Sequence, residues 1–213
     1  MKKPTLLLAD DHVVFVEGLQ KILEPEFEVL GSVRDGRTMV SEVLKLKPDV
    51  VLAVITMPLL NGIDAARQIR KARPGPKIVF LTMHADPIYA AEALDAGASG
   101  YLVKHSAARE IVTAIRTVLR GRTYVTPLVA RGVLEPLRAS AHRDKRKAQQ
   151  LTPRQREVLQ LVAEGRSAKE IATILNVSHR TIEFHKQRIM GELGIHTTAE
   201  LTRFAIEHRV LAL

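Results

Sequence analysis

The sequence from Ser167 to Gly194, SAKEIATILNVSHRTIEFHKQRIMGELG, predicts two short helices joined by a tight turn. Ser167 and Glu170 have the spacing of a capping box, which satisfies the first amides of a helix. Asn176 suits the left-handed conformation that ends such a helix, and Ser178 then caps a second one. The apolar residues Ile182, Ile189 and Leu193 recur at helical spacing along the second helix. A small core between the two helices is expected from Ile171, Leu175, Val177 and Ile182.

The second helix turns a polar and largely cationic face away from that core. Its outward side chains are expected to be Arg180, Glu183, Phe184, Lys186, Gln187 and Arg188. A cationic face with hydrogen-bonding groups, on the second helix of such a pair, suits the major groove of DNA. The alternative is an ordinary helical hairpin with a solvated charged face, because short helix-pair patterns often arise without this function.

Helices are also predicted on both sides of this pair. Thr152, Pro153 and Gln155 form a second capping box, and Thr197 with Glu200 forms a third. With these four helices, residues 151 to about 210 resemble the LuxR/NarL/FixJ class of DNA-binding domains.

The resemblance implies roles for individual side chains. Those expected to face base edges are Glu183, Phe184 and Gln187, and those expected to face the DNA backbone are Lys169, Arg180, Thr181, His185 and Arg188. A dimer contact is expected on the fourth helix, at Leu201, Ala205 and Ile206.

Composition is compatible with this interpretation. The chain has 213 residues, 46% of them hydrophobic, and no cysteine, so disulfides and thiolate metal sites are excluded. The net charge of +9 is concentrated at the C-terminal end, with 16 basic and 9 acidic residues from position 121 onward. Such a surface suits DNA phosphates but also other acidic partners. The N-terminal apolar run is too short for a signal peptide or a membrane span, so we expect a soluble cytoplasmic protein.

Short aliphatic runs alternate with helical periods over the first 120 residues. Strands are predicted at Thr5–Ala9, Val29–Val33, Val50–Ile55, Ile78–Met83 and Gly100–Val103. Helices are predicted at Val14–Leu23, Thr38–Leu46, Ile63–Ala72, Ile88–Ala96 and Ala107–Leu119. This alternation predicts an α/β doubly wound parallel sheet of five strands, in flavodoxin-like order, with a crevice at the carboxyl ends of the strands.

Polar side chains end three of these strands. Asp10 and Asp11 end the first, Thr82 the fourth, and Lys104 the fifth. This set resembles the receiver domain of two-component response regulators, over residues 4 to about 120. The resemblance implies that Asp10 and Asp11 bind Mg²⁺, that Thr82 and Lys104 hold a phosphoryl group, and that Tyr101 is the aromatic residue that rotates inward on activation.

The sequence departs from the receiver pattern at one position. The phosphoacceptor aspartate of the family corresponds to Val54, which has no nucleophilic atom, and Asp49 lies at the wrong end of the strand. We therefore expect a phosphorylation-dead receiver with weakened Mg²⁺ binding that defaults to the inactive state. Retention of the other site residues favours a substitution made for study. The alternative is a natural pseudo-receiver controlled by a ligand or a protein.

The sequence offers two further interpretations of the crevice. Histidines near the strand ends, His12, His84 and His105, raise the possibility of a transition-metal site, but isolated histidines beside a solvated crevice are common. A phosphohydrolase is disfavoured because no acid ends the third strand, so we expect no enzyme.

The sequence predicts a receiver domain at residues 1–121, a linker at 122–150 and a helix-turn-helix domain at 151–213. The linker is predicted to hold a short helix, followed by a basic tether with Arg143, Lys145, Arg146 and Lys147. The expected partners are double-stranded DNA, a cognate sensor histidine kinase and, in the active state, a second copy of the chain.

Overall fold

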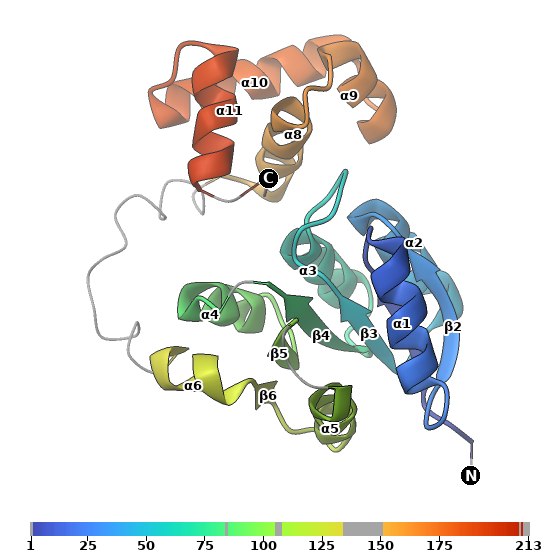
Figure 1. The fold of residues 1–213 in the computed structure, drawn as a ribbon. Helices are drawn as coiled ribbons and strands as arrows, with labels where there is room; N and C mark the ends of the chain where they lie inside the picture. Colours follow the sequence, from blue (N-terminus) through green and yellow to red (C-terminus); the bar gives the residue numbers. More distant parts are fainter. Residues whose placement is uncertain (1, 84, 105–107, 134–150, 209, 211–213) are drawn as a thin grey trace. The chain divides into compact units, whose positions relative to one another are not determined.

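The computed structural model of the chain describes residues 2–83, 85–104, 108–133, 151–208 and 210 (Figure 1). The chain divides into two compact units, Met1–Ala139 and Ser140–Leu213. The basic residues of the predicted tether and two of the three crevice histidines, His84 and His105, lie outside the described residues.

The first unit is built around a six-stranded sheet in the order β2-β1-β3-β4-β5-β6. Its strands are β1 (Thr5–Ala9), β2 (Glu28–Val33), β3 (Val50–Ala53), β4 (Lys77–Thr82), β5 (Gly100–Val103) and β6 (Tyr124–Val125). Neighbouring strands pair in parallel throughout. The predicted doubly wound sheet and its five strands are confirmed, and a sixth strand of two residues is added at the edge.

Helices cover both faces of the sheet (Figure 1). They are α1 (Val13–Leu23), α2 (Gly36–Leu46), α3 (Gly62–Ala72), α4 (Pro87–Asp95), α5 (Ala108–Leu119) and α6 (Pro127–Val133). Alternate residues of β1 point to opposite faces, so Leu6 and Leu8 pack with α1 and α5, whereas Leu7 and Ala9 pack with α2 and α3. Burial on both faces explains the nearly continuous aliphatic character of the strands.

The predicted linker, residues 122–150, begins with structure that belongs to the first unit. β6 pairs with the first two residues of β5, and the N–H of Thr126 donates to the carbonyl of Tyr101 at 3.0 Å. α6 then packs against α4, with Val129 fully buried in the core of the sheet unit. The apolar residues that predicted a linker helix therefore contribute to this core.

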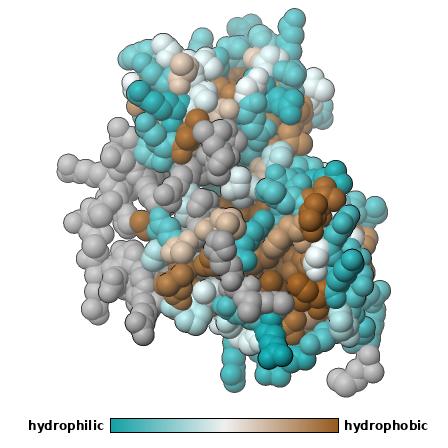
Figure 2. All heavy atoms as spheres, in the orientation of Figure 1, coloured by the Kyte–Doolittle hydropathy of each residue, from teal (hydrophilic) through white to brown (hydrophobic). Residues whose placement is uncertain are grey.

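The second unit contains α8 (Pro153–Ala163), α9 (Ala168–Leu175), α10 (His179–Leu193) and α11 (Thr198–Glu207). All three predicted capping boxes are present, at Thr152, Ser167 and Thr197, each with its reciprocal glutamine or glutamate. The visible surface of this unit is mainly hydrophilic (Figure 2). Among the described residues of the whole chain, every helix is too short or too polar to cross a membrane.

Candidate functional site

The carboxylate of Asp10 lies in the crevice at the carboxyl ends of the strands. Asp10 follows β1 and is 4% exposed. Its Oδ1 accepts a hydrogen bond from the backbone N–H of His12 at 3.0 Å, and its Oδ2 accepts one from Nζ of Lys104 at 2.7 Å. Both oxygens of this buried carboxylate therefore have a donor, which offsets the cost of burying the charge.

Lys104 connects three strands of the sheet at this edge. Besides its ion pair with Asp10, its ammonium lies 4.3 Å from the ring centroid of Phe15 on α1. Its backbone N–H donates to the carbonyl of Thr82 at 2.6 Å, which joins the ends of β5 and β4. Thr82 itself is buried. The structure thus brings Asp10, Thr82 and Lys104 to one edge of the sheet, as predicted.

Val54 lies just beyond the end of β3, which stops at Ala53 rather than at Ile55 as predicted. Its side chain is 6% exposed, and its N–H donates to the carbonyl of Ala9 at 2.9 Å. The start of α3 packs closely here, because a Cβ on Gly62 would lie 2.2 Å from the carbonyl oxygen of Val54. Only glycine permits that approach, so the position of residue 54 is fixed by the surrounding backbone.

Asp10, Asp11 and His12 form a small group of possible metal ligands. Within the described residues, one ligand atom from each lies within 4.8 Å of the others. Nδ1 of His12 is 3.0 Å from Oδ1 of Asp10 and 3.0 Å from Oδ1 of Asp11. Two carboxylates suit a hard cation such as Mg²⁺. Val54 adds no side-chain oxygen, however, and Lys104 occupies one oxygen of Asp10, so the ligand set fits Mg²⁺ only in part.

Tyr101, the predicted switch aromatic, has no exposed surface. It lies in β5 and belongs to the core cluster that also contains Ala90 of α4 and Val129 of α6. Its ring is thus held inside the unit, beneath the helices that follow β4 and β6.

In the second unit, local chemistry sets where α9 ends and where α10 begins. Asn176 ends α9 in the left-handed conformation, with φ of 51°. The hydroxyl of Ser178 accepts the backbone N–H of Thr181 at 3.1 Å and also hydrogen bonds to the hydroxyl of Thr181 at 2.8 Å. Thr181 therefore takes part in the cap that begins α10, in addition to the DNA-backbone role expected for it.

The side chains expected to meet DNA differ in exposure. Lys169, Arg180, Phe184, Gln187 and Arg188 are exposed, whereas Thr181, Glu183 and His185 are half-buried. Phe184 is 57% exposed, which is unusual for a large hydrophobic side chain and matches a base-contacting role better than a core role. Ile182 and Ile189 are fully buried on the opposite side of the helix.

His185 differs from the surface cations around it. Burial, followed by the positive charges of Arg154 and Arg188, lowers the pKa of its imidazole. Its Nδ1 is buried and has no hydrogen-bond partner among the described residues. A neutral His185 can donate one hydrogen bond to a phosphate but adds no positive charge.

Polar contacts that the sequence did not predict hold α10 against α8. Nε2 of the buried Gln155 donates to Oε2 of Glu192 at 2.7 Å, and Nε of Arg188 donates to Oε1 of Glu192 at 3.0 Å. Arg154 donates to the carbonyl of Leu175 at 3.0 Å, which ties α8 to the end of α9. The i, i+4 spacing of Arg188 and Glu192 was the only sequence signal for this network.

The expected dimer contact on the fourth helix requires a correction. Leu201 and Ala205 of α11 have no exposed surface, and α11 packs mainly against α8. These two residues complete the core of the domain, so they are not available to a second copy. Ile206 is half-buried.

The chain combines a parallel sheet whose edge groups Asp10, Thr82 and Lys104 with a helix-turn-helix unit that exposes a cationic helix. This combination defines a DNA-binding response regulator. Comparison with known families agrees. Residues 6–116 match the response regulator receiver domain, and residues 149–205 match the bacterial regulatory proteins of the luxR family.

This chain belongs to the two-component response regulators with a LuxR-type DNA-binding domain, which are transcriptional regulators and not enzymes. It is 37% identical over 212 residues to the transcriptional regulatory protein MctR of Rhizobium johnstonii, covering 99% of this chain and 96% of that one. It is 34% identical to the oxygen regulatory protein NreC of Staphylococcus aureus, covering 97% and 98% of the two chains.

Solved structures that resemble this chain belong to the same class of response regulators. RcsB from Salmonella enterica serovar Typhimurium, bound to the promoter P1flhDC in the presence of the phosphomimetic BeF3-, matches with a TM-score of 0.63 and 28% identity, over 97% of this chain and 100% of that one. A LuxR-family response regulator from Aurantimonas sp. SI85-9A1 matches with a TM-score of 0.61 and 33% identity, over 64% of this chain and 99% of that one.

Proposed function

We propose that this response regulator cannot accept a phosphoryl group at the end of β3. The observation that carries the proposal is the buried hydrocarbon side chain of Val54 beside an otherwise complete set of Asp10, Thr82 and Lys104. Phosphoryl transfer needs an oxygen nucleophile at that point, and valine has none. A phosphorylation-dead form made for study accounts best for the retention of the other three residues.

Mg²⁺ binding is expected to be weakened but not abolished. Asp11 would bind the ion directly and Asp10 through water, and the ion would neutralise charge on a phosphoryl group. The same crevice would face a cognate sensor histidine kinase, in the cytoplasm. The two functional domains in this proposal are a receiver, residues 1–121, and a helix-turn-helix domain, residues 151–213.

The DNA interface in this proposal is the exposed face of α10. Glu183, Phe184 and Gln187 read base edges there. Phosphate contacts come from Lys169 on α9 and from Arg180, Thr181, His185 and Arg188 on α10. The active form is a homodimer on two half-sites. Leu201 and Ala205 take no part in its interface.

A second candidate is a natural pseudo-receiver with constitutive DNA binding. The burial of Tyr101 favours it, because the inward position of this aromatic is the one that the receiver resemblance associates with activation. A receiver locked in that arrangement would need no phosphoryl group to expose its dimer surface. Under this alternative the chain does not default to the inactive state.

Solution mass, measured by light scattering, distinguishes the two candidates. We would compare this chain, Val54→Asp and the uncharged control Val54→Asn, each with and without Mg²⁺ and beryllofluoride. Dimerisation of Val54→Asp alone, and only with the phosphoryl mimic, would support the phosphorylation-dead receiver. Dimers of all three forms without the mimic would support the constitutive pseudo-receiver instead.

A further inference from the structure

The segment made of β6 and α6, called the strap, lies at the edge of the sheet beside β5 (Figure 1). β6 pairs with Gly100 and Tyr101, the first two residues of β5, and the ladder ends there. The N–H of Thr126, the next residue of the strap, donates to the carbonyl of Tyr101 at 3.0 Å. The rest of the β5 edge, which leads to Lys104 in the acid crevice, therefore depends on contacts other than strand pairing.

The side chain of Thr126 continues the contact where the ladder ends. Its buried hydroxyl accepts the backbone N–H of Val103 at 3.3 Å and donates to Oε1 of Glu110 on α5 at 3.0 Å. The carbonyl of Thr126 accepts the N–H groups of Val129 and Ala130 at 2.9 and 3.0 Å, in the first turn of α6. One residue thus joins β5, α5 and α6, and these hydrogen bonds of Thr126 are called the latch.

Glu110 supports the latch from α5. Its Oε1 also accepts the hydroxyl of Tyr124 at 3.2 Å, so one carboxylate oxygen binds two side chains of the strap. Burial, followed by the charge of Glu110 and this hydrogen bond, raises the pKa of the Tyr124 phenol, which therefore remains a donor at neutral pH. Hydrogen bonds to an ionised acceptor are stronger than those between neutral groups.

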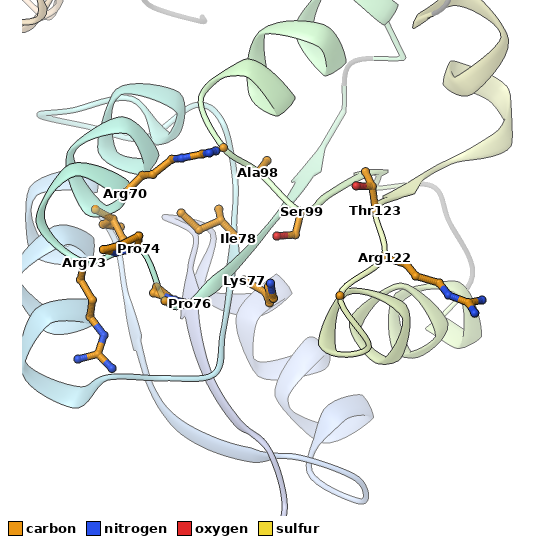
Figure 3. A pocket seen from close by; sticks show the side chains of 14 residues that line it. Arg70, Arg73, Pro74, Pro76, Lys77, Ile78, Ala98, Ser99, Arg122 and Thr123 are labelled. Carbon is orange, nitrogen blue, oxygen red and sulfur yellow. The ribbon is translucent and has the colours of Figure 1, made fainter.

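The turn that precedes β6 borders a polar cavity of about 310 Å³. Figure 3 shows Ser99 and Thr123 beside this cavity and the side chain of Arg122 directed away from it. The strap is therefore loosely packed at its start. Its hold on the sheet depends on the latch and on the packing of α6.

The latch lies on the part of β5 that also serves the crevice. The carbonyl of Tyr101 binds the strap, and Val103 immediately precedes Lys104, whose ammonium pairs with Asp10 at 2.7 Å. On the side of α6, Val129 belongs to the same core cluster as Tyr101. A shift of β5 at the crevice therefore changes the geometry of the latch, and a loosened latch changes the support of β5.

We propose that the latch couples the acid crevice to α6, so that a change in the pairing of Lys104 changes how firmly α6 is held. α6 is the last described element before residues 134–150, through which the chain continues to the DNA-binding unit. The crevice thus acts on the start of this connection through β5 and Thr126. The coupling does not require phosphoryl transfer at position 54, so its failure would leave the phosphorylation-dead proposal intact.

The test is amide hydrogen exchange of the full chain, resolved by NMR at Val129 and Ala130. Thr126→Val removes the latch hydroxyl at nearly constant shape, whereas Thr126→Ser retains it. Thr123→Val, at an exposed threonine before β6, is the matched control. Exchange in β1, which lies between β2 and β3, reports on global unfolding and is the reference.

A double-mutant cycle tests the coupling itself. Lys104→Met breaks the ion pair at the crevice and is made alone and together with Thr126→Val. Melting temperatures check that the variants fold. If Thr126→Val does not fold, Glu110→Gln takes its place, because it makes the acceptor of the latch neutral at similar size.

Relative to β1, exchange at Val129 and Ala130 should accelerate about tenfold or more in Thr126→Val and stay nearly unchanged in Thr126→Ser and Thr123→Val. Lys104→Met should accelerate the same exchange when the latch is intact and add little in Thr126→Val. The proposal is overturned if Thr126→Val has no effect, or if Lys104→Met has no effect or the same effect in both backgrounds. It is also overturned if every change merely follows the exchange of β1.

Discussion

Replacing Lys104 by methionine is expected to lower the free energy of unfolding of the sheet unit by about 3 kcal/mol. The ion pair with Asp10 is 2.7 Å long, and the two side chains are 13% and 5% exposed. At an effective dielectric constant of about 20, the attraction at this distance is about 6 kcal/mol before desolvation. Removing one partner of a buried pair costs about 3 to 5 kcal/mol. The N–H of His12 still supports the carboxylate, which favours the low end of that range.

The assay is urea unfolding of the full chain, monitored by circular dichroism, in a double-mutant cycle with Asp10→Asn. The cycle isolates the coupling between the two side chains from the packing of the lysine stem on Phe15. Lys45→Met is the control, because Lys45 pairs with Glu42 at 3.3 Å but is 72% exposed, so its loss should cost less than about 1 kcal/mol.

A loss of stability in Lys104→Met no larger than in the control, or a cycle without coupling, would refute a stabilising ion pair between Lys104 and Asp10. A second expectation uses the Val54→Asp background. A carboxylate at position 54 would compete with Asp10 for the ammonium of Lys104, so the coupling measured there should be smaller. An unchanged coupling would mean that Lys104 does not serve position 54.

Three further predictions concern the metal, the DNA and the response to pH. Val54→Asp should bind Mg²⁺ more tightly than this chain because it adds a ligand, and it should be less stable without metal because it adds a negative charge to an acidic crevice. Calorimetry with Mg²⁺ tests the first effect and unfolding in the presence of a chelator tests the second. Equal Mg²⁺ affinities of the two forms would contradict the prediction. Gln187→Ala should lower the binding free energy by about 1 to 3 kcal/mol through one base pair. Arg188→Ala should weaken binding to all DNA sequences alike and reduce the slope of log affinity against log salt concentration by about 1. Fluorescence anisotropy on specific and scrambled duplexes distinguishes the two effects, and equal losses of affinity in both variants would refute the assignment of Gln187 to bases and Arg188 to phosphates. Because burial lowers the pKa of His185, the unfolded chain takes up a proton at higher pH than the folded chain, so stability falls as pH drops below about 6.5. In His185→Gln the melting temperature should therefore depend less on pH between about 7.5 and about 5. An unchanged pH dependence of the melting temperature would count against the prediction.

The helix starts of the DNA-binding domain were predictable because their chemistry is local. A capping box spans four residues, so Thr152, Ser167 and Thr197 could be recognised without knowing what packs around them. The helix predicted at Thr38–Leu46 begins two residues earlier, at Gly36, because Asp35 caps it. β6 was missed because a strand of two residues has no period, and its pairing with β5 is set by contacts far away in the sequence.

The grouping of the crevice residues was predictable because the carboxyl ends of parallel strands lie at the same edge of a sheet. This rule alone brought Asp10, Thr82 and Lys104 together. It did not reveal that Lys104 pairs with Asp10, because the choice of partner depends on side-chain geometry in the folded unit. The burial of Leu201 was missed for a related reason, since an amphipathic helix does not specify which neighbour covers its apolar face.

In α10, the residues that hold the helix in its domain are different from the residues that it exposes to a partner. Ile182 and Ile189 anchor it by burial, and Glu192 links it to α8 through Gln155. Phe184 and Gln187 are exposed and take no part in that anchoring. In the DNA interface proposed above, new side chains at these two positions would therefore change the preferred DNA sequence at little cost to folding. Under that proposal, a few surface substitutions are enough to direct the domain to a new DNA sequence, a route open to evolution and to a protein engineer alike.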